Sequence, residues 1–125
     1  MGVRGFGATA ERAFEQAAIA MTAVITDPGK VSAEQSVPIH CEAPDPELLL
    51  VDWLNALIYE MATRKLLFSR FEVRLTQNVL DALAWGERLD PEKHGPGVEI
   101  KGATYTALRV ERTNGEWVAQ CVVDV

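Results

Sequence analysis

The residues with the most evident chemical potential stand at the carboxyl end of the chain. Asp124 is followed by Val125, whose free α-carboxylate places two carboxylates side by side. Such oxygen donors suit hard cations such as Ca²⁺ and Mg²⁺, although two carboxylates alone make a weak site. An exposed residue on an alternating strand is the simpler interpretation of Asp124. Lys101 either contacts a partner, neutralises a nearby carboxylate, or is only a solvated lysine.

The two histidines offer little catalytic machinery. His40 precedes Cys41 on a predicted strand, where neighbouring side chains face opposite sides, so an imidazole–thiol pair is not expected. His94 lies in a charged stretch with no second ligand at metal-binding spacing, and we expect it to be solvated. Asp52 interrupts an apolar helix, so a structural role is expected, with the carboxylate facing water or held by a partner.

Motifs of independent enzymes are absent from the sequence. There is no Gly-x-Ser-x-Gly, no phosphate-binding glycine loop and no His-x-x-x-His pair. A free-standing metal hydrolase needs at least three protein ligands and an open coordination position, which these residues do not offer. The sequence therefore predicts a protein that is not an enzyme in its own right.

Length, charge and cysteine usage restrict the class of protein further. A chain of 125 residues, 48% of them hydrophobic, suits one compact domain. Its formal charge of −6, without a run of Lys or Arg, disfavours tight direct binding to nucleic acid. Cys41 and Cys121 are far apart and are expected to be buried thiols. With no signal-peptide pattern and no stretch of about 18 apolar residues, a cytoplasmic location without membrane association is expected.

Two helices are predicted to position these groups. Thr9 can cap a helix that begins at Ala10, has apolar residues at three- and four-residue steps, and ends before the segment 27–29 (Asp-Pro-Gly). The dipeptide 45–46 (Asp-Pro) then predicts a second helix through about Thr63, because proline is favoured at the first helical position.

The remaining apolar pattern is typical of strands, because it alternates with a period of two. Pro38 argues that its strand is an edge strand or that the strand begins there, and Asn-Gly at 114–115 predicts a tight hairpin turn. Between them, the charged segment 86–97 (GERLDPEKHGPG) is expected to be a long loop. Predicted strands cover residues 3–6, 36–43, 70–75, 79–85, 103–111 and 116–125. The predicted fold class is α+β, with two helices packed on a largely antiparallel sheet in a single domain, residues 1–125.

Several ordered segments together resemble the archease family. They span essentially the whole chain and are therefore more specific than any one short motif. The matching segments are residues 2–7 (GVRGFG), 13–18 (AFEQAA), 48–55 (LLLVDWLN), 67–69 (LFS), 86–94 (GERLDPEKH), 99–105 (EIKGATY) and 122–125 (VVDV).

This resemblance implies a function for the chain. Archeases are cofactor proteins of the GTP-dependent RNA ligase that joins tRNA halves during splicing, and they promote guanylylation and turnover of the ligase. Lys101 matches a functionally implicated lysine of the family, so the resemblance implies that it acts at the nucleotide bound by the ligase. The alternative role, also proposed within the family, is a chaperone or modulator of an RNA-modifying enzyme such as a tRNA methyltransferase.

A divalent cation is also implied by the resemblance, with Ca²⁺ as the first expectation and Mg²⁺ or Mn²⁺ as alternatives. Its family ligands map onto Asp124 and Val125. The third ligand is an Asp in a His-Thr-Ala-Asp phrase before the segment matched by residues 1–4, and this sequence lacks that phrase. We therefore expect either a truncated start or a weakened metal site. Gly102 and Thr106 also depart from the family pattern near Lys101.

Overall fold

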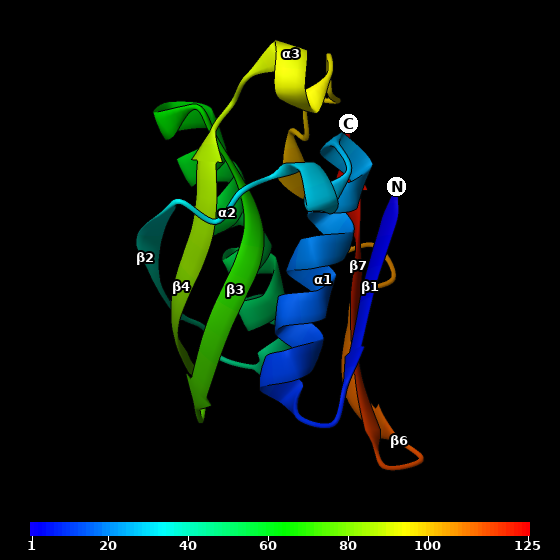
Figure 1. Cartoon of the computed structure of the whole chain (residues 1–125). Coiled ribbons are helices and arrows are strands. Elements are labelled where there is room, and N and C mark those ends of the chain that lie inside the picture. The colour runs from blue at the N-terminus through cyan, green and yellow to red at the C-terminus, as the bar shows by residue number, and fades with distance from the viewer.

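The computed structural model describes residues 1–125 as one α+β unit (Figure 1). Neither of its long helices is apolar enough to cross a bilayer. In chain order the elements are β1 (Gly2–Gly7), α1 (Ala10–Ile25), η1 (Pro28–Lys30), β2 (Gln35–Glu42), α2 (Pro46–Arg64), β3 (Leu66–Thr76), β4 (Val79–Arg88), α3 (Pro91–His94), β5 (Gly102–Ala103), β6 (Arg109–Thr113) and β7 (Glu116–Asp124).

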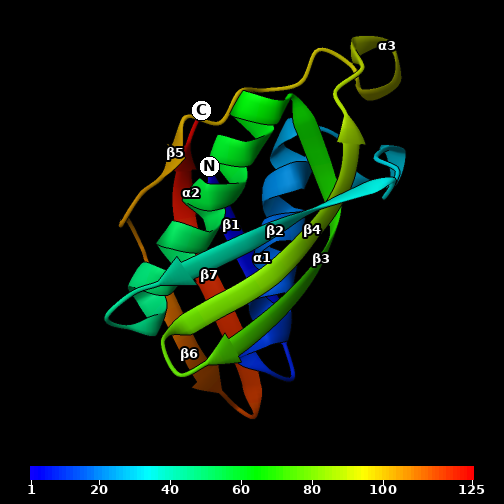
Figure 2. The same ribbon diagram turned by 90° about the vertical axis from the view of Figure 1, so that its left-hand side faces the viewer.

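The strands form two antiparallel sheets, so the predicted fold class is confirmed while the expected single sheet is divided. In the first sheet β7 pairs with β1 and with both β5 and β6. The second sheet has the order β2-β4-β3. Figure 2 shows the two sheets facing each other with the long helices between them. Pro38 lies on the edge strand β2, as its inability to donate a hydrogen bond predicts.

The core lies where the two long helices meet between the sheets. Trp53 of α2 is fully buried, and its indole Nε1 donates a hydrogen bond to the carbonyl oxygen of Phe14 in α1 over 3.1 Å. The Trp53 ring also meets Phe71 of β3 edge to face, with centroids 5.8 Å apart. One side chain thus joins both helices to the second sheet. Both cysteines, Cys41 and Cys121, are buried and free, as predicted.

Side chains of the helices close the open edges of the sheets. Glu15 of α1 accepts a hydrogen bond from the backbone N–H of Val73 over 2.9 Å, at the edge strand β3. Thr22, two turns further along α1, donates to the carbonyl of Phe68 in the same strand. On the other side, Glu47 of α2 accepts from the N–H of Val110 in β6 over 3.0 Å. These contacts satisfy edge groups that would otherwise be costly to bury.

The predicted helix starts and the predicted Asn-Gly hairpin turn are confirmed. Thr9 accepts from the N–H of Arg12, and Asp45 accepts from the N–H of Leu48 ahead of Pro46. The β3–β4 hairpin turns at residues 77–78. The β6–β7 hairpin turns at residues 114–115, both with positive φ.

The expected strand over residues 103–111 is wrong, because it breaks into β5 and β6. From Ala103 to Arg109 the chain advances six residues, whereas their partners on β7, Val123 and Gln120, are only three apart. The extra residues bulge out in a turn in which Ala107 has a positive φ. The sequence carries one trace of this insertion, because the alternation changes phase at the adjacent apolar residues Ala107 and Leu108.

The expected long loop at 86–97 is also wrong in part. β4 continues through Arg88, and the turn-like helix α3 begins at Pro91. Asp90 caps α3 by accepting from the N–H of Glu92. Position 86 of β4 requires glycine, because a side chain there would overlap the backbone of Leu67. The irregular segments are therefore the short connection at residues 89–90 and residues 95–101, apart from α3 itself.

Close approach of α1 to β1 gives the first prediction. A methyl group at Gly5 would overlap the backbone nitrogen of Ala17 and the backbone oxygen of Ala13. Gly5→Ala must therefore push the helix away from the strand, and we expect it to lower the free energy of unfolding by about 1–3 kcal/mol.

The measurement is urea unfolding followed by circular dichroism. Gly2→Ala is the matched control on the same strand, because no atom lies within 4 Å of a methyl group there. Equal stability of the two variants would show that α1 does not pack against β1 as closely as described.

Candidate functional site

The residues singled out at Lys101 and Asp124 come together at one end of the molecule. The backbone N–H of Lys101 donates to the carbonyl of Asp124 over 2.7 Å, just before β5 pairs with the end of β7. Met1 lies at the same end, because its carbonyl accepts from the N–H of Val123 over 2.8 Å. Both chain termini are therefore adjacent, as Figure 1 shows.

The side chains at this end are exposed to solvent. Asp124, Val125 and Lys101 are all exposed. The ammonium group of Lys101 takes part in none of the chain's ion pairs. The ammonium group of Lys101 and the carboxylates of Asp124 and Val125 are thus accessible to a ligand.

Asn55 of α2 fixes the position of β5. Its side-chain oxygen accepts from the backbone N–H of Ala103 over 2.8 Å. On the other side of β5, the N–H and hydroxyl of Thr104 both donate to the carbonyl of Val122, each over 2.9 Å. The main chain that carries Lys101 is therefore held between a helix and a strand. The sequence pattern did not single out Asn55 for this role, because a polar residue on a helix has many unremarkable explanations.

The donors at the carboxyl end fit a hard divalent cation in kind but not in number. The carboxylates of Asp124 and Val125 supply oxygen ligands, which Ca²⁺ and Mg²⁺ prefer. No cluster of three His, Cys, Asp or Glu side chains in the chain is arranged to hold a metal ion. Since Ca²⁺ takes about six to eight oxygens, these two carboxylates would need further oxygen ligands to complete a site.

His40 and Cys41 are separated as predicted. His40 is exposed, and its ring contacts Asp81 over 2.6 Å and Glu42 over 3.2 Å. These two hydrogen bonds, the one that His40 donates to Asp81 above all, raise the pKa of His40. Cys41 points into the core, where burial raises the pKa of its thiol to about 11. The thiol is therefore protonated at neutral pH, which excludes it as a ready nucleophile. Asp52 is exposed and faces water.

The expectation of a solvated His94 is wrong. His94 is 5% exposed, and its Nε2 lies 2.9 Å from a carboxylate oxygen of Glu87. The backbone N–H of Asp90 donates to its Nδ1 over 2.9 Å, so Nδ1 accepts and Nε2 carries the proton. The Asp-Pro pair at 90–91 could have predicted the helical turn that buries His94, because the same pair begins α2. This helical turn folds His94 back onto β4.

Glu87 gathers three segments around one carboxylate. It accepts hydrogen bonds from Lys93, from the backbone N–H of Ser32 and from His94, which together lower its pKa to about 2. Charge-assisted contacts of this kind favour the ionised form. The hydroxyl of Thr26 at the end of α1 also donates to the carbonyl of His94 over 2.7 Å. This Glu87 cluster anchors α3, and with it the start of the segment leading to Lys101.

The Glu87 cluster should make stability depend on pH. Because folding lowers the pKa of Glu87 from 4.5 to about 2, its contribution is complete above about pH 5 and is lost as the pH falls through 2. We expect Glu87→Gln to be less stable than the unsubstituted chain at pH 7 and the difference to shrink between about pH 5 and pH 2.

Urea unfolding at a series of pH values measures this difference. The exposed Glu72→Gln on β3 is the control. A difference between Glu87→Gln and the unsubstituted chain that stays constant down to pH 2 would contradict the role given to the Glu87 carboxylate.

Comparisons with known proteins identify the relatives of the chain. The sequence profile of the Archease protein family matches residues 1–125. Protein archease of Methanosarcina mazei is 42% identical over 96% of this chain and 86% of its own length. Protein archease of Pyrococcus furiosus is 38% identical over 100% of this chain and 92% of its own length.

Solved structures agree with the fold. The solution structure of protein 1598 of Methanobacterium thermoautotrophicum superposes with a TM-score of 0.84 at 30% identity, covering 99% of this chain and 91% of that one. A Thermotoga maritima protein described as an archease and possible chaperone superposes with a TM-score of 0.69, covering 100% of this chain and 90% of that one; at 18% identity it supports the fold alone. With a profile match over its full length and relatives of this similarity, the chain belongs to the archease family.

Proposed function

We propose that this chain is an activator of the GTP-dependent RNA ligase of tRNA splicing, promoting guanylylation and turnover of the ligase without being an enzyme itself. Membership of the archease family supports the proposal. The single observation that carries it further is the main-chain contact between Lys101 and Asp124. This contact presents a free ammonium group and carboxylates at one exposed end, an arrangement able to enter the nucleotide site of a larger partner.

The chemistry at that end would act on phosphate groups. The carboxylates of Asp124 and Val125 would hold a divalent cation, with Ca²⁺ first and Mg²⁺ or Mn²⁺ as alternatives. Such a cation, when bound, supplies positive charge for phosphate oxygens. Lys101 adds a second positive charge, since an ammonium group on a flexible stem binds phosphate as a point charge. Together they would help position the triphosphate of GTP for attack within the ligase.

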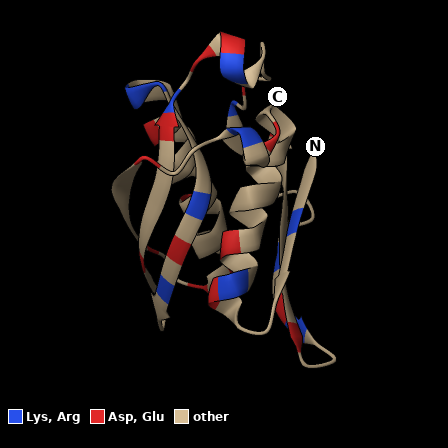
Figure 3. Cartoon of the chain, in the orientation of Figure 1, with Lys and Arg blue, Asp and Glu red and all other residues tan.

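The charge of the chain supports action through a protein partner rather than through direct binding to RNA. The formal charge is −6, and Figure 3 shows acidic and basic positions interspersed along the elements. A protein that binds a nucleic-acid backbone directly needs several Lys or Arg side chains aligned along it. The nucleic acid would instead be held by the ligase.

The alternative function is that of a chaperone or modulator of an RNA-modifying enzyme such as a tRNA methyltransferase. A Thermotoga maritima protein of the same fold is described as a possible chaperone, which is why this alternative is considered. An aggregation assay with unrelated client proteins separates the two proposals. Broad protection of clients, with no effect on ligase guanylylation, would favour the chaperone.

Cation binding by the carboxyl end is the next prediction. Isothermal titration of Ca²⁺ should give one weak site. Asp124→Asn should weaken binding at this site at least about tenfold, because it removes the charge of one of the two carboxylates that would hold the cation. Glu116→Gln, an exposed acidic residue at the opposite end of β7, is the matched control. Identical titrations for both variants would place any bound cation elsewhere.

Stimulation of the ligase tests the function itself. With GTP, the ligase and the unsubstituted chain, guanylylation should accelerate. Lys101→Ala and Asp124→Ala should each reduce that acceleration at least about tenfold, because the first removes a positive charge that would stabilise the phosphate groups and the second removes a ligand of the proposed cation. Arg112→Ala, which removes an exposed cation from the far end of the same sheet, should stimulate normally. Normal stimulation by both site variants would contradict the proposal.

A further inference from the structure

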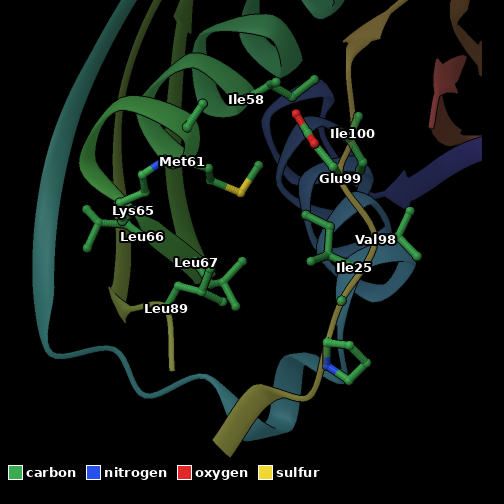
Figure 4. Close-up of a pocket in the computed structure, with 13 residues that line it drawn as sticks. Ile25, Ile58, Met61, Lys65, Leu66, Leu67, Leu89, Val98, Glu99 and Ile100 are labelled. Atoms are coloured by element: carbon green, nitrogen blue, oxygen red, sulfur yellow. The ribbon is translucent and has the colours of Figure 1, made fainter. Parts of the chain in front are cut away.

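An apolar cavity lies beside the proposed site and has no part in it. It has a volume of about 340 Å³ and opens between the C-terminal half of α2, the end of α1 and the segment before Lys101. Figure 4 shows Ile58 and Met61 of α2 on one side and Ile25 with residues 98–100 on the other. A volume in this range accommodates a few side chains or a small ligand.

Two large apolar side chains at this cavity remain in water. Leu89 is 43% exposed and Val98 is 44% exposed, and both line the cavity. Leu66 and Leu67, which also line it, are buried. Exposed apolar groups clustered around a concavity, rather than scattered singly, are typical of a binding surface.

The main chain along one wall of the cavity is unpaired. The four peptide N–H groups of residues 97–100 donate to no group in the chain, and the carbonyls of residues 96–100 accept from none. Pairing begins only at Lys101, whose N–H donates to Asp124. An added strand binds through free N–H and C=O groups of alternate residues along one edge, and residues 98 and 100, beyond the positive φ of Gly97, offer such a pair. A small apolar ligand would fill the cavity but leave these groups unused.

We infer that the cavity and residues 96–100 together bind an extended segment of the partner ligase, whose main chain pairs with residues 97–100 while an aliphatic side chain enters the cavity. This inference rests on the proposed function, because the partner is the ligase. Alternate side chains of an extended segment point to one side, so aliphatic side chains on that side can enter the cavity while the residues between them point away from it. Since residue 100 adjoins Lys101, docking here would bring the Lys101–Asp124 end to the nucleotide site.

The test of the cavity is the affinity for the ligase, measured by isothermal titration with the full chain. Leu89→Glu places a charge at the cavity rim and should weaken binding at least about tenfold, as loss of a central apolar contact does. Leu83→Glu is the matched control, because Leu83 is 36% exposed on β4 but lies outside the cavity lining. Equal affinity of these two variants would overturn the inference.

The test of strand pairing uses the backbone of residue 98. Val98→Pro removes one N–H that has no partner within the chain, whereas Val98→Ala keeps the N–H and shortens the side chain. We expect Val98→Pro to bind the ligase several-fold more weakly than Val98→Ala, with both variants unchanged in melting temperature. Equal binding by the two would show that the N–H of residue 98 is not used in docking, which overturns the extended-segment proposal.

The same experiments separate this inference from the proposed function. Leu89→Glu and Val98→Pro should reach half-maximal stimulation of guanylylation only at higher concentrations of the variant chain, with the same maximal stimulation. Lys101→Ala should instead lower the maximal stimulation. If the unsubstituted chain binds the ligase through the cavity but does not stimulate guanylylation, the activator function fails and the docking surface stands. If it stimulates and Leu89→Glu does so at the same concentrations, the docking surface fails alone.

Discussion

The hydrogen bond from the indole of Trp53 to the carbonyl of Phe14 is the contact on which the rest of the arrangement depends. It joins α1 and α2 at their buried crossing, where a polar indole N–H must find a partner. Because α1 lies against β1 at Gly5, this contact fixes α2 relative to the first sheet. Two residues beyond Trp53, on roughly the opposite side of the helix, Asn55 holds β5. The position of Lys101 is thus set from the core outward.

Local signals in the sequence predicted the elements well because their physical causes are local. Thr9 and Asp45 cap helices with their own side chains, and Asn-Gly at 114–115 accepts positive φ angles that other residues resist. The division into two sheets could not be predicted in this way. Alternation tells which side of a strand is buried, but it does not tell which strand is its neighbour. The break at residues 104–108 left only a change of phase at Ala107 and Leu108, and the alternation on either side of it favoured one continuous strand.

The candidate site was predictable only in part. Asp124, Val125 and Lys101 were singled out by their chemistry and by the family resemblance, and the contact between Lys101 and Asp124 brings them together. Asn55 and the cavity beside residues 96–100 depend on segments that are distant in sequence, so no local pattern pointed to them. His94 was misjudged because its partner, Glu87, lies on a strand that runs further than the charged composition indicated.

The proposed ligase partner is tested most directly by hydrogen exchange of backbone amides, compared between the free chain and a mixture with the ligase. If the end bearing Lys101 and Asp124 enters the ligase, protection should rise at residues 97–103 and 122–125. The outer side of the sheet formed by β2, β4 and β3 should then exchange as in the free chain. Protection confined to that outer side, with residues 97–103 unchanged, would contradict the account.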